Sequence, residues 1–541
     1  MEDFAMNVAA MTVGALAQAG VKRIYGLIGD SLNAIGDAVR LNNRIQWIPV
    51  RHEESAAFAA GAEAFLTGNL AVCAGTCGPG SLHLLNGLYE AARNESPVLA
   101  LVTHIPVSEI GTEYFQETNP MAVFKDCSVF CETVMSAEQM PRLLQSAMQA
   151  ALAQKGVAVL VVPSDVAKAE IPAAQTVYAR TVDNKPTTLS PAPADIEKLA
   201  KIINSHGRIT LYCGIGCRFA KDEVLALAQK IKSPIVHTIR SKDFMENGNP
   251  FNVGLNGYLS SGEPKTALES CDLLLLLGTD YPYRALLPTA PDVVQIDTKA
   301  AHLGRRSKLT FGIKASVKSA LTVLLPLILE KKNESHLTLS LAHRDEVTAQ
   351  KHNALVQHAK RTPLRPEYLT AVLNDIAPDN AVFVVDVGLN DVWAARYLQA
   401  KGTRRIIGSF KHGTMAAALS AGIGAFYALP RGTPVIVLAG DGGLSMLLGE
   451  LLTVIQNHVD LKVVVYNNAT LGFIDFEATL EKIPPFKTEL LNPDFAKLAQ
   501  TIGFKTVRIT SPDNLRTVLT AALNETGAVL IDAVTDPAAM P

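Results

Sequence analysis

The strongest constraint on the fold is the stretch from Gly440 to Phe473. The apolar run Val435–Ala439 just before it is typical of a buried strand and stops at the glycine-rich turn G-D-G-G. Leu444–Val454 then has helical periodicity, and Leu461–Tyr466 has the composition of the next strand. The stretch therefore predicts a βαβ unit of a parallel sheet, with polar residues after each strand.

Both strand ends of this unit carry oxygen-bearing side chains. Asp441 follows the first strand and Asn467-Asn468 follow the second, and ligands of such units bind at the carboxyl ends of the strands. Carboxylate and amide oxygens suit Mg²⁺, and Gly442-Gly443 lets backbone N–H groups approach a diphosphate closely. The alternative is an acidic turn and an asparagine pair that only close two strands.

The composition is that of a large globular enzyme. A chain of 541 residues, 48% apolar and 18% charged, is long enough for about three to four domains with substantial cores. Its 49 basic and 51 acidic residues form no long single-sign blocks, so we expect no nucleic-acid partner. An anionic cofactor must therefore be held by local groups.

The cysteines and the N-terminus indicate a cytoplasmic protein. The seven cysteines include three pairs four positions apart, not the CxxC spacing of zinc and redox sites, so we expect buried free thiols. The chain begins without a basic segment followed by an apolar core, and no uncharged apolar stretch approaches the ~20 residues that span a bilayer. We expect no export.

Hydrophobic periodicity divides the chain into three parts. We expect an α/β fold of three doubly wound parallel-sheet domains at 1–180, 190–335 and 360–541, joined by a linker at 173–195 and a charged connector at 331–366. The predicted helices include Val8–Ala19, Ser55–Phe65, Ser81–Ala92, Leu341–His358 and Leu515–Asn524; the predicted strands include Ala71–Ala74, Val157–Val162, Ile209–Cys213, Leu273–Leu277 and Ala528–Val534, with a turn at Pro163-Ser164-Asp165.

Several motifs, spread over nearly the whole chain, resemble those of thiamine-diphosphate enzymes. They are G-D-G followed by N-N, R-H-E-E-x-A-A-F-A-A-G-A-E-A, L-A-V-C-A-G-T-C-G-P-G, Y-F-Q-E-T and Y-P-Y-R-A. Within these enzymes the chain is most similar to the pyruvate oxidase family, and there to the quinone-reducing pyruvate dehydrogenases of bacteria. The resemblance implies a pyrimidine-binding first domain, an FAD-binding middle domain and a diphosphate-binding last domain.

The resemblance assigns cofactor roles to named residues. Glu53 corresponds to the glutamate that activates the cofactor: its acid proton, held in an apolar site, favours the imino form of the aminopyrimidine. Without the resemblance, Glu53 is only an acidic residue that caps a helix. Met415 corresponds to the residue that props the cofactor into its bent shape, although a methionine before alanines is ordinarily core. Asp441, Asn468 and the carbonyl of Thr470 correspond to metal ligands. The implied thiamine-diphosphate contacts are Glu53, Thr414, Met415, Ala416, Asp441, Gly442, Gly443, Asn468, Ala469, Thr470, Leu471, Gly472, Phe473 and Ile474.

Four further residues are candidates for contacting the substrate. Phe115 and Gln116 lie in a polar loop, where a ring and an amide could hold a small keto acid, although Phe115 could equally anchor the loop. Phe473 and Glu477 are four positions apart on one face of a predicted helix, although Phe473 could simply cap the core. With Glu53, these four are the predicted catalytic residues.

The middle domain carries candidate FAD contacts at its strand ends. An acid after a strand can bind ribose hydroxyls, and backbone at a threonine-containing turn can line phosphates. The turn Cys213–Arg218 lacks the third glycine of a dinucleotide fingerprint, and Ala315-Ser316 stands where the family often has Gly-Asp. The candidate FAD contacts are Asn256, Gly257, Thr279, Asp280, Tyr281, Pro282, Tyr283 and Asp297.

The resemblance implies oxidative decarboxylation of pyruvate to acetate or acetyl phosphate and CO₂, with thiamine diphosphate, Mg²⁺ and FAD as cofactors. Electrons would pass from FAD to a quinone or oxygen. The alternatives are a non-oxidative 2-keto acid decarboxylase, an acetolactate-synthase-like carboligase, or a non-catalytic subunit that keeps the fold. The family also implies a homotetramer, a dimer of dimers. We do not expect membrane association, because the C-terminal lipid-binding tail of the quinone-reducing relatives has no counterpart here.

Overall fold

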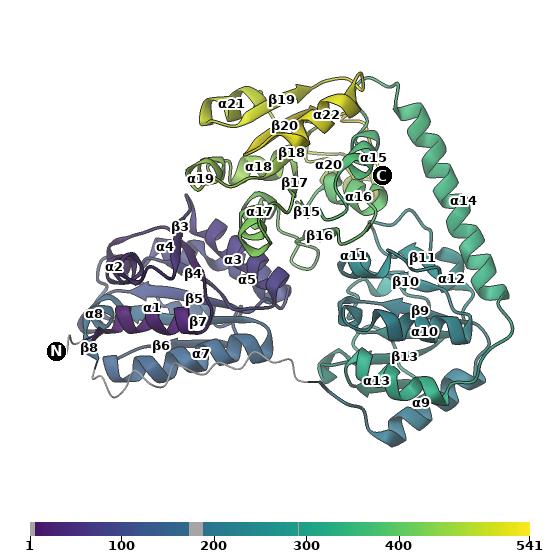
Figure 1. The fold of residues 1–541 in the computed structure, drawn as a ribbon, viewed down its shortest axis with the longest axis horizontal. Coiled ribbons are helices and arrows are strands. Elements are labelled where there is room, and N and C mark those ends of the chain that lie inside the picture. The colour runs from purple at the N-terminus through teal and green to yellow at the C-terminus, as the bar shows by residue number, and fades with distance from the viewer. Residues whose placement is uncertain (1–5, 172–187, 290) are drawn as a thin grey trace.

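The computed structural model describes residues 6–171, 188–289 and 291–541, and these residues form three α/β domains, each with a parallel sheet of six strands (Figure 1). The predicted fold class is therefore confirmed. Most of the predicted linker at 173–195 lies outside the described residues. No helix among the described residues combines the length and apolarity that a membrane span requires.

The first domain has the strand order β3-β2-β4-β5-β7-β6. Strands β5 and β7 are buried along their whole length, as expected for parallel strands covered on both faces. A short antiparallel pair, β1 (Met6–Asn7) and β8 (Glu170–Ile171), lies outside the sheet. The other elements are β2 (Arg23–Gly26), β3 (Gln46–Pro49), β4 (Ala71–Gly75), β5 (Val98–His104), β6 (Phe130–Thr133), β7 (Val157–Pro163), α1 (Val8–Gln18), α2 (Asn33–Asn42), α3 (Glu53–Thr67), α4 (Pro79–His83), α5 (Leu85–Arg93), α6 (Pro120–Phe124), α7 (Met140–Gln154) and α8 (Ser164–Lys168).

The middle domain has the order β11-β10-β9-β12-β13-β14, in which the chain runs outward from β9 in both directions. A long helix, α14 (Ser335–His358), leads out of this domain along one side of the molecule (Figure 1). The other elements are β9 (Ile209–Cys213), β10 (Ile235–His237), β11 (Asn252–Leu255), β12 (Leu273–Leu277), β13 (Asp292–Asp297), β14 (Phe311–Lys314), α9 (Pro193–Ser205), α10 (Lys221–Ile231), α11 (Lys242–Met245), α12 (Lys265–Glu269) and α13 (Val317–Leu324).

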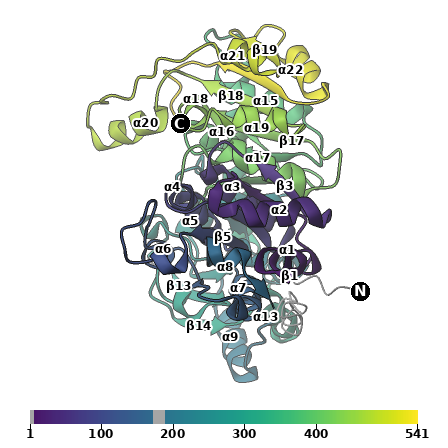
Figure 2. The ribbon, with the colours of Figure 1, turned by 90° about the vertical axis from the view of Figure 1, so that its left-hand side faces the viewer.

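The third domain has the order β16-β15-β17-β18-β20-β19, which repeats the strand order of the first domain. Figure 2 shows α20 projecting from the body of this domain. The elements are β15 (Val382–Val385), β16 (Arg405–Gly408), β17 (Val435–Gly440), β18 (Lys462–Asn467), β19 (Lys505–Ile509), β20 (Val529–Val534), α15 (Pro366–Ile376), α16 (Leu389–Tyr397), α17 (Ala417–Ala428), α18 (Asp441–Met446), α19 (Glu450–Gln456), α20 (Gly472–Glu481), α21 (Phe495–Ile502) and α22 (Leu515–Asn524).

The strand orders fix where ligands should bind. In a doubly wound sheet, neighbouring strands whose connections leave in opposite directions open a crevice at their carboxyl ends. These switch points lie between β2 and β4 in the first domain, β9 and β12 in the middle domain, and β15 and β17 in the third. The turn at Asp441 follows β17 and therefore borders the third crevice.

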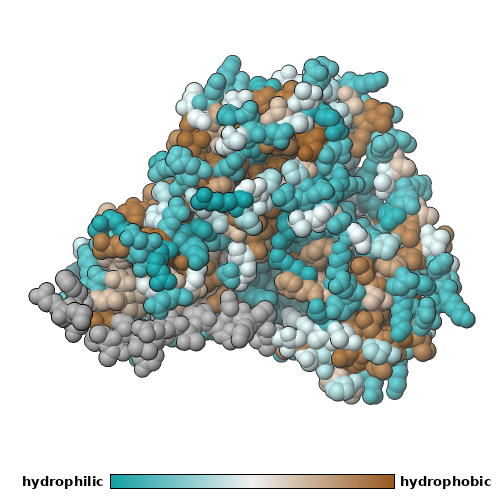
Figure 3. All heavy atoms as spheres, viewed as in Figure 1, coloured by the Kyte–Doolittle hydropathy of each residue, from teal (hydrophilic) through white to brown (hydrophobic). Residues whose placement is uncertain are grey.

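The first and third domains of one chain pack through helices α3 and α17. Ser420 donates a hydrogen bond of 2.9 Å to Ser55 across this contact, and a Cβ at Gly424 would lie 2.1 Å from the carbonyl oxygen of Ala59. Small residues therefore bring the two helices into close contact. On the face seen in Figure 3, hydrophilic residues are interspersed with small apolar areas, in keeping with the balanced charge composition.

Three predicted elements were wrong. The helix predicted at Leu444–Val454 is two helices, α18 and α19, because Leu447 leaves the helical conformation (φ −123°, ψ 39°). The helix predicted at Ser81–Ala92 is likewise divided between α4 and α5 at Leu84. The turn predicted at Pro163-Ser164-Asp165 begins the short helix α8.

Candidate active site

A small cavity of about 90 Å³ lies at the switch point of the third domain. The turn after β15 and the turn after β17 form two of its walls, and the segment after β18 closes it. Ten of the fourteen predicted thiamine-diphosphate contacts line this cavity, and four, Glu53, Thr414, Ala416 and Ala469, do not. The ten are Met415, Asp441, Gly442, Gly443, Asn468, Thr470, Leu471, Gly472, Phe473 and Ile474.

The ten lining residues all belong to the third domain, whereas Glu53 lies in the first. The structure thus gathers the residues of one domain at one crevice. Their positions follow from the parallel sheet, since strands that run side by side bring their carboxyl-terminal turns together.

Asp441 is the first residue of α18 and is only 2% exposed. Its Oδ1 accepts a hydrogen bond from the N–H of Gly442 at 2.9 Å, and its Oδ2 accepts one from the N–H of Ala469 at 2.6 Å. Burial raises the pKa of Asp441, and these N–H donors oppose that rise. The donors fix the orientation of a carboxylate that borders the cavity.

Asn468 and Thr470 complete a set of hard oxygen donors. Asn468 directly follows β18, and its Oδ1 accepts a hydrogen bond of 3.2 Å from the N–H of Thr470. An antiparallel bridge between Thr470 and Glu489 braces this segment. A carboxylate, an amide and a backbone carbonyl at one crevice match the ligand preference of Mg²⁺. The donor set therefore fits the predicted metal.

Two glycines and Met415 shape the other side of the cavity. A Cβ at Gly442 would lie 2.8 Å from Leu471 and 3.4 Å from the Met415 Cε atom, so a larger residue would fill this space. Met415 is followed by Ala416, which has a left-handed backbone (φ 69°). The bare backbone at Gly442-Gly443 fits a diphosphate, as the turn sequence predicted.

Glu53 lies at the start of α3 with its side chain 5% exposed. Its Oε2 lies 2.9 Å from Nδ1 of His83, and a Cβ at Gly80 would come within 2.8 Å of its Oε1. His52 caps α3 by accepting a hydrogen bond from the N–H of Glu54, and its ring stacks on that of His83. Glu53 therefore belongs to a polar group at the first domain's own crevice and not to the Asp441 cavity.

Hydrogen bonds join the residues around Glu53 to the third domain of the same chain. Glu450, in α19, accepts hydrogen bonds from the N–H groups of Arg51 at 3.1 Å and His52 at 2.8 Å. Asn86 donates to Glu54 at 2.6 Å and to Thr414 at 3.0 Å. Glu450 is the first residue of α19, so the helix that follows the break after α18 begins at this contact with the first domain.

The four predicted substrate contacts do not meet at one place. Phe115 is 77% exposed, whereas Gln116 turns inward and accepts a hydrogen bond of 3.2 Å from the Cys77 thiol. Phe473 borders the Asp441 cavity and also packs against the third domain's core. Glu477 is exposed on α20 and does not line the cavity.

The candidate FAD residues follow β11, β12 and β13, at the carboxyl edge of the middle sheet. Tyr281 and Tyr283 lie together in an aromatic group with Tyr258, and the buried Tyr281 hydroxyl has no hydrogen-bond partner among the described residues. A Cβ at Gly257 would lie 2.8 Å from this hydroxyl. An unpartnered buried hydroxyl at a switch-point edge fits a bound polar ligand.

The two acidic residues among the FAD candidates, Asp280 and Asp297, already have partners within the chain. Asp280 pairs with Arg305, and Asp297 accepts a hydrogen bond of 2.8 Å from the N–H of Lys299 and lies 3.2 Å from Nδ1 of His302. The remaining candidates make local contacts: the carbonyl oxygen of Thr279 accepts a hydrogen bond from Gln295 at 3.1 Å, Asn256 donates one to Leu286 at 3.2 Å, and Pro282 follows in the same turn.

Ala315 and Ser316, which stand where the family often has Gly-Asp, have a local structural role. Ser316 is the N-cap of α13 and accepts a hydrogen bond of 3.2 Å from the N–H of Ser319, and Ala315 is fully buried.

All seven cysteines are free, and six of them are buried, which agrees with the expectation from their spacing.

Three polar residues near the predicted site had no role in the prediction. They are Asn492, which bonds to Asp441; His83, which bonds to Glu53; and Asp386, which directly follows β15. Asp386 has a signal in the sequence, since it is a polar residue at a strand end. His83 and Asn492 have none, because only the folded chain places them beside their partners.

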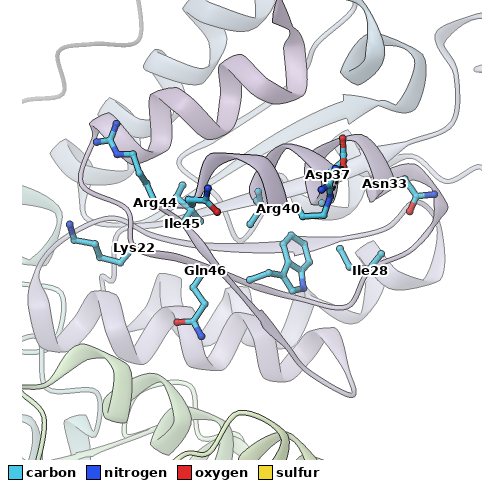
Figure 4. A pocket seen from close by; sticks show the side chains of 12 residues that line it. Lys22, Ile28, Asn33, Asp37, Arg40, Arg44, Ile45 and Gln46 are labelled. Carbon is cyan, nitrogen blue, oxygen red and sulfur yellow. Dashed lines mark hydrogen bonds and ion pairs between the residues drawn. The ribbon is translucent and has the colours of Figure 1, made fainter.

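A larger hollow of about 740 Å³ lies elsewhere on the first domain, between α2 and the segment that enters β3 (Figure 4). Lys22 and Arg44 border it, and Arg40 pairs with Asp37 at 2.6 Å within α2. It contains none of the predicted site residues and shares no lining residue with the Asp441 cavity.

Comparison with known proteins agrees with this arrangement of domains. Residues 6–123 match the N-terminal TPP binding domain of thiamine pyrophosphate enzymes, 196–324 their central domain, and 386–533 their C-terminal TPP binding domain. The chain therefore belongs to the thiamine pyrophosphate enzyme family.

Relatives within this family cover nearly the whole chain. A putative thiamine pyrophosphate-containing protein of Bacillus subtilis, YdaP, is 35% identical over 96% of this chain and 89% of its own length. The pyruvate oxidase of Lactiplantibacillus plantarum is 30% identical over 97% of this chain and 88% of its own. A probable acetolactate synthase large subunit of Methanocaldococcus jannaschii is 30% identical over 98% and 92%.

Proposed function

We propose that this protein oxidatively decarboxylates pyruvate to acetate or acetyl phosphate and CO₂, using thiamine diphosphate, Mg²⁺ and FAD, with a quinone or oxygen as the final electron acceptor. The observation that carries the proposal is the convergence of Asp441, Asn468 and Gly442-Gly443 on one switch-point cavity. The full-length similarity to a relative named pyruvate oxidase supports the choice of substrate.

The residues of this chain bind and orient the cofactor. Asp441, Asn468 and the Thr470 carbonyl would hold Mg²⁺, and the backbone at Gly442-Gly443 would face the diphosphate. Thiamine diphosphate, when bound, supplies a nucleophilic carbon and an electron sink for the loss of CO₂ from a 2-keto acid. The Glu53 carboxyl would hold a proton at Oε1 or Oε2 for the aminopyrimidine ring, and its 5% exposure keeps water away from that proton.

The site requires two chains in this proposal. A cavity of about 90 Å³ is far smaller than the ~300 Å³ or more of sites that enclose a small molecule. All of its lining residues come from the third domain, whereas Glu53 lies in the first. We infer that the first domain of one protomer completes the site on the third domain of its partner, in a dimer or a dimer of dimers.

FAD binding at the middle domain is the second part of the proposal. It is supported by the strand order with a switch point between β9 and β12 and by the unpartnered Tyr281 hydroxyl at that edge. The ion pairs of Asp280 show that this carboxylate would have to exchange partners before it could bind a ribose hydroxyl.

A second candidate function is acetolactate synthesis or non-oxidative decarboxylation. It is favoured by relatives named acetolactate synthase, which are 27–30% identical over at least 95% of this chain. The fold alone does not separate these reactions, because function depends on the site and not on the scaffold.

One experiment separates the candidates. Pyruvate is added to the purified protein without oxygen, flavin absorbance is followed, and acetate, acetyl phosphate, acetaldehyde and acetolactate are assayed. Bleaching of the flavin with formation of acetate or acetyl phosphate supports the proposal. Acetaldehyde or acetolactate without bleaching would establish one of the alternatives instead.

A further inference from the structure

Asp386 is a buried carboxylate at the switch point of the third domain. It directly follows β15, is 1% exposed, and lies four residues before Asn390, whose amide donates a hydrogen bond of 2.7 Å to the Asp386 carbonyl oxygen. Its own N–H donates to the carbonyl oxygen of Leu438 in β17 at 2.9 Å. The Asp386 backbone is therefore fixed on both sides of the crevice.

The side chain of Asp386 bonds to the turn that carries Met415. Its Oδ2 accepts a hydrogen bond of 3.2 Å from the N–H of Ala416. Ala416 has a positive φ of 69°, a strained conformation for a residue other than glycine, which needs support from its surroundings. The carboxylate supplies that support at the residue after Met415.

The same carboxylate touches the glycine wall of the cavity. A Cβ at Gly443 would lie 2.0 Å from the Asp386 Oδ2 atom and 3.3 Å from the Ala416 nitrogen, and a Cβ at Gly442 would lie 3.4 Å from the Met415 Cε atom. One side chain thus holds the Met415 turn against the backbone that the proposed function assigns to the diphosphate.

We propose that Asp386 is a positioning residue, which fixes the Met415 turn against Gly442-Gly443 and thereby sets the bent conformation in which thiamine diphosphate is held. The inference rests on the proposed function of the Asp441 cavity. Asp386 does not line that cavity and acts through Met415. A displaced Met415 would leave the metal ligands in place but would move the aminopyrimidine away from the thiazolium carbon.

The pKa shift of Asp386 agrees with a buried carboxylate that accepts hydrogen bonds from N–H groups. Burial raises the pKa of Asp386 to about 7, and the N–H groups at Val387 and Ala416–Ala418 limit that rise. Its Oδ1 has no hydrogen-bond partner among the described residues. Asp391, on the following helix, is also a buried acid, but no hydrogen bond joins its side chain to the Met415 turn among the described residues.

This difference makes Asp391 a matched control. The test compares Asp386→Ala, Asp386→Asn and Asp391→Asn in the full chain loaded with thiamine diphosphate and Mg²⁺. Two quantities are measured: the dissociation constant of the cofactor, and the rate at which the proton on its thiazolium carbon exchanges with deuterium, read by NMR after acid quench. The exchange rate reports how the aminopyrimidine is placed, independently of turnover.

We expect Asp386→Ala to slow the exchange ~10- to 100-fold, the effect of a small misplacement, with a smaller change in cofactor affinity. Asp386→Asn keeps one oxygen for the Ala416 N–H and should slow the exchange less. Asp391→Asn should exchange at the wild-type rate. If Asp386→Ala does not fold, Asp386→Asn decides: exchange at the wild-type rate in that variant overturns the inference.

A double-mutant cycle tests whether Asp386 acts through Met415. In a Met415→Ala background, Asp386→Asn should slow the exchange by much less than it does alone, because coupled residues are not additive. Equal effects in both backgrounds would overturn the inference. Failure of the wild-type chain to bind thiamine diphosphate would instead refute the proposed function, so the two failures are distinguishable.

Discussion

Asn492 donates a hydrogen bond of 2.7 Å from Nδ2 to Oδ2 of Asp441, although the two residues are 51 positions apart. The same amide donates to Oδ1 of Asn467 at 3.0 Å. With the N–H of Ala469, two donors therefore hold the Oδ2 atom of Asp441. A loop beyond α20 thus orients the carboxylate that we propose as a metal ligand.

The first prediction concerns this carboxylate. Asp441→Ala should weaken the binding of Mg²⁺ and of thiamine diphosphate together, because the metal joins protein oxygens to phosphate oxygens. Calorimetric titration of each component, with the other present, measures both affinities, and a large excess of both should restore part of the activity. Unchanged affinity for the cofactor would mean that Asp441 is not a metal ligand.

The second prediction concerns Asn492, which orients Asp441 without lining the cavity. Asn492→Ala should weaken Mg²⁺ binding ~10- to 100-fold, as loss of an outer partner of a metal ligand commonly does. Asn204→Ala removes an amide that bonds within the middle domain and serves as the control. Equal affinities for Mg²⁺ in the two variants would exclude an orienting role.

The third prediction concerns Glu53. Glu53→Gln keeps a hydrogen-bond partner for His83 but cannot supply an acid proton, so turnover should fall ~10²- to 10⁴-fold while the fold and cofactor affinity persist. Glu54→Gln changes the neighbouring carboxylate, which bonds to Asn86, and should lose far less activity. Near-wild-type turnover in Glu53→Gln would remove this residue from the mechanism.

The fourth prediction tests whether two chains share each site. Glu53→Gln and Asp441→Ala proteins are mixed and allowed to exchange subunits. If one protomer supplies Glu53 and its partner supplies Asp441, half of the dimers become mixed, one of their two sites is intact, and activity returns to about a quarter of wild type. If both residues of a site came from one chain, no activity would return. Sedimentation of the wild type should also show no active monomer.

The sheet strands were the most predictable part of the fold. Ile209–Cys213 and Leu273–Leu277 match β9 and β12 residue for residue, because buried parallel strands are continuous apolar runs that end at glycine turns. The predicted strands do not include β5, although Val98–His104 is also buried throughout and mostly apolar. This strand could have been predicted, because its apolar run is visible in the sequence.

The interdomain contacts could not be predicted. Glu450, which begins the helix after the break, bonds to Arg51 and His52, 399 and 398 positions away. Local hydrophobic periodicity carries no information about such distant partners. The metal-ligand prediction rested on strand ends, which the parallel register brings together. Asn492, whose amide orients Asp441, lies in a loop. A loop has no hydrophobic periodicity, so the sequence does not predict where this side chain lies.

The last prediction concerns pH and the contact between the first and third domains. Glu90, in α5, is 8% exposed, and its Oε2 accepts a hydrogen bond of 2.5 Å from the Ser409 hydroxyl. Burial raises the pKa of Glu90 from 4.5 to about 7, against the hydrogen bonds from Ser409 and Asn94 and the nearby cation of Arg240. The folded protein therefore holds this proton more tightly than the unfolded chain does.

The sign of the pH dependence follows from that shift. Below pH 4.5 Glu90 is protonated in both states and its contribution to stability is fully present; as the pH rises through about 7, that contribution is lost. The rise of the pKa from 4.5 to about 7 corresponds to a loss of roughly 3 to 4 kcal/mol at most. Glu90→Gln cannot ionise and still accepts a hydrogen bond from Ser409, so it should raise the thermal midpoint at about pH 8 and leave it nearly unchanged at about pH 5. Glu132→Gln, at an exposed position of β6, should change neither midpoint. An equal gain for Glu90→Gln at both pH values would show that packing, and not ionisation, limits stability at this contact.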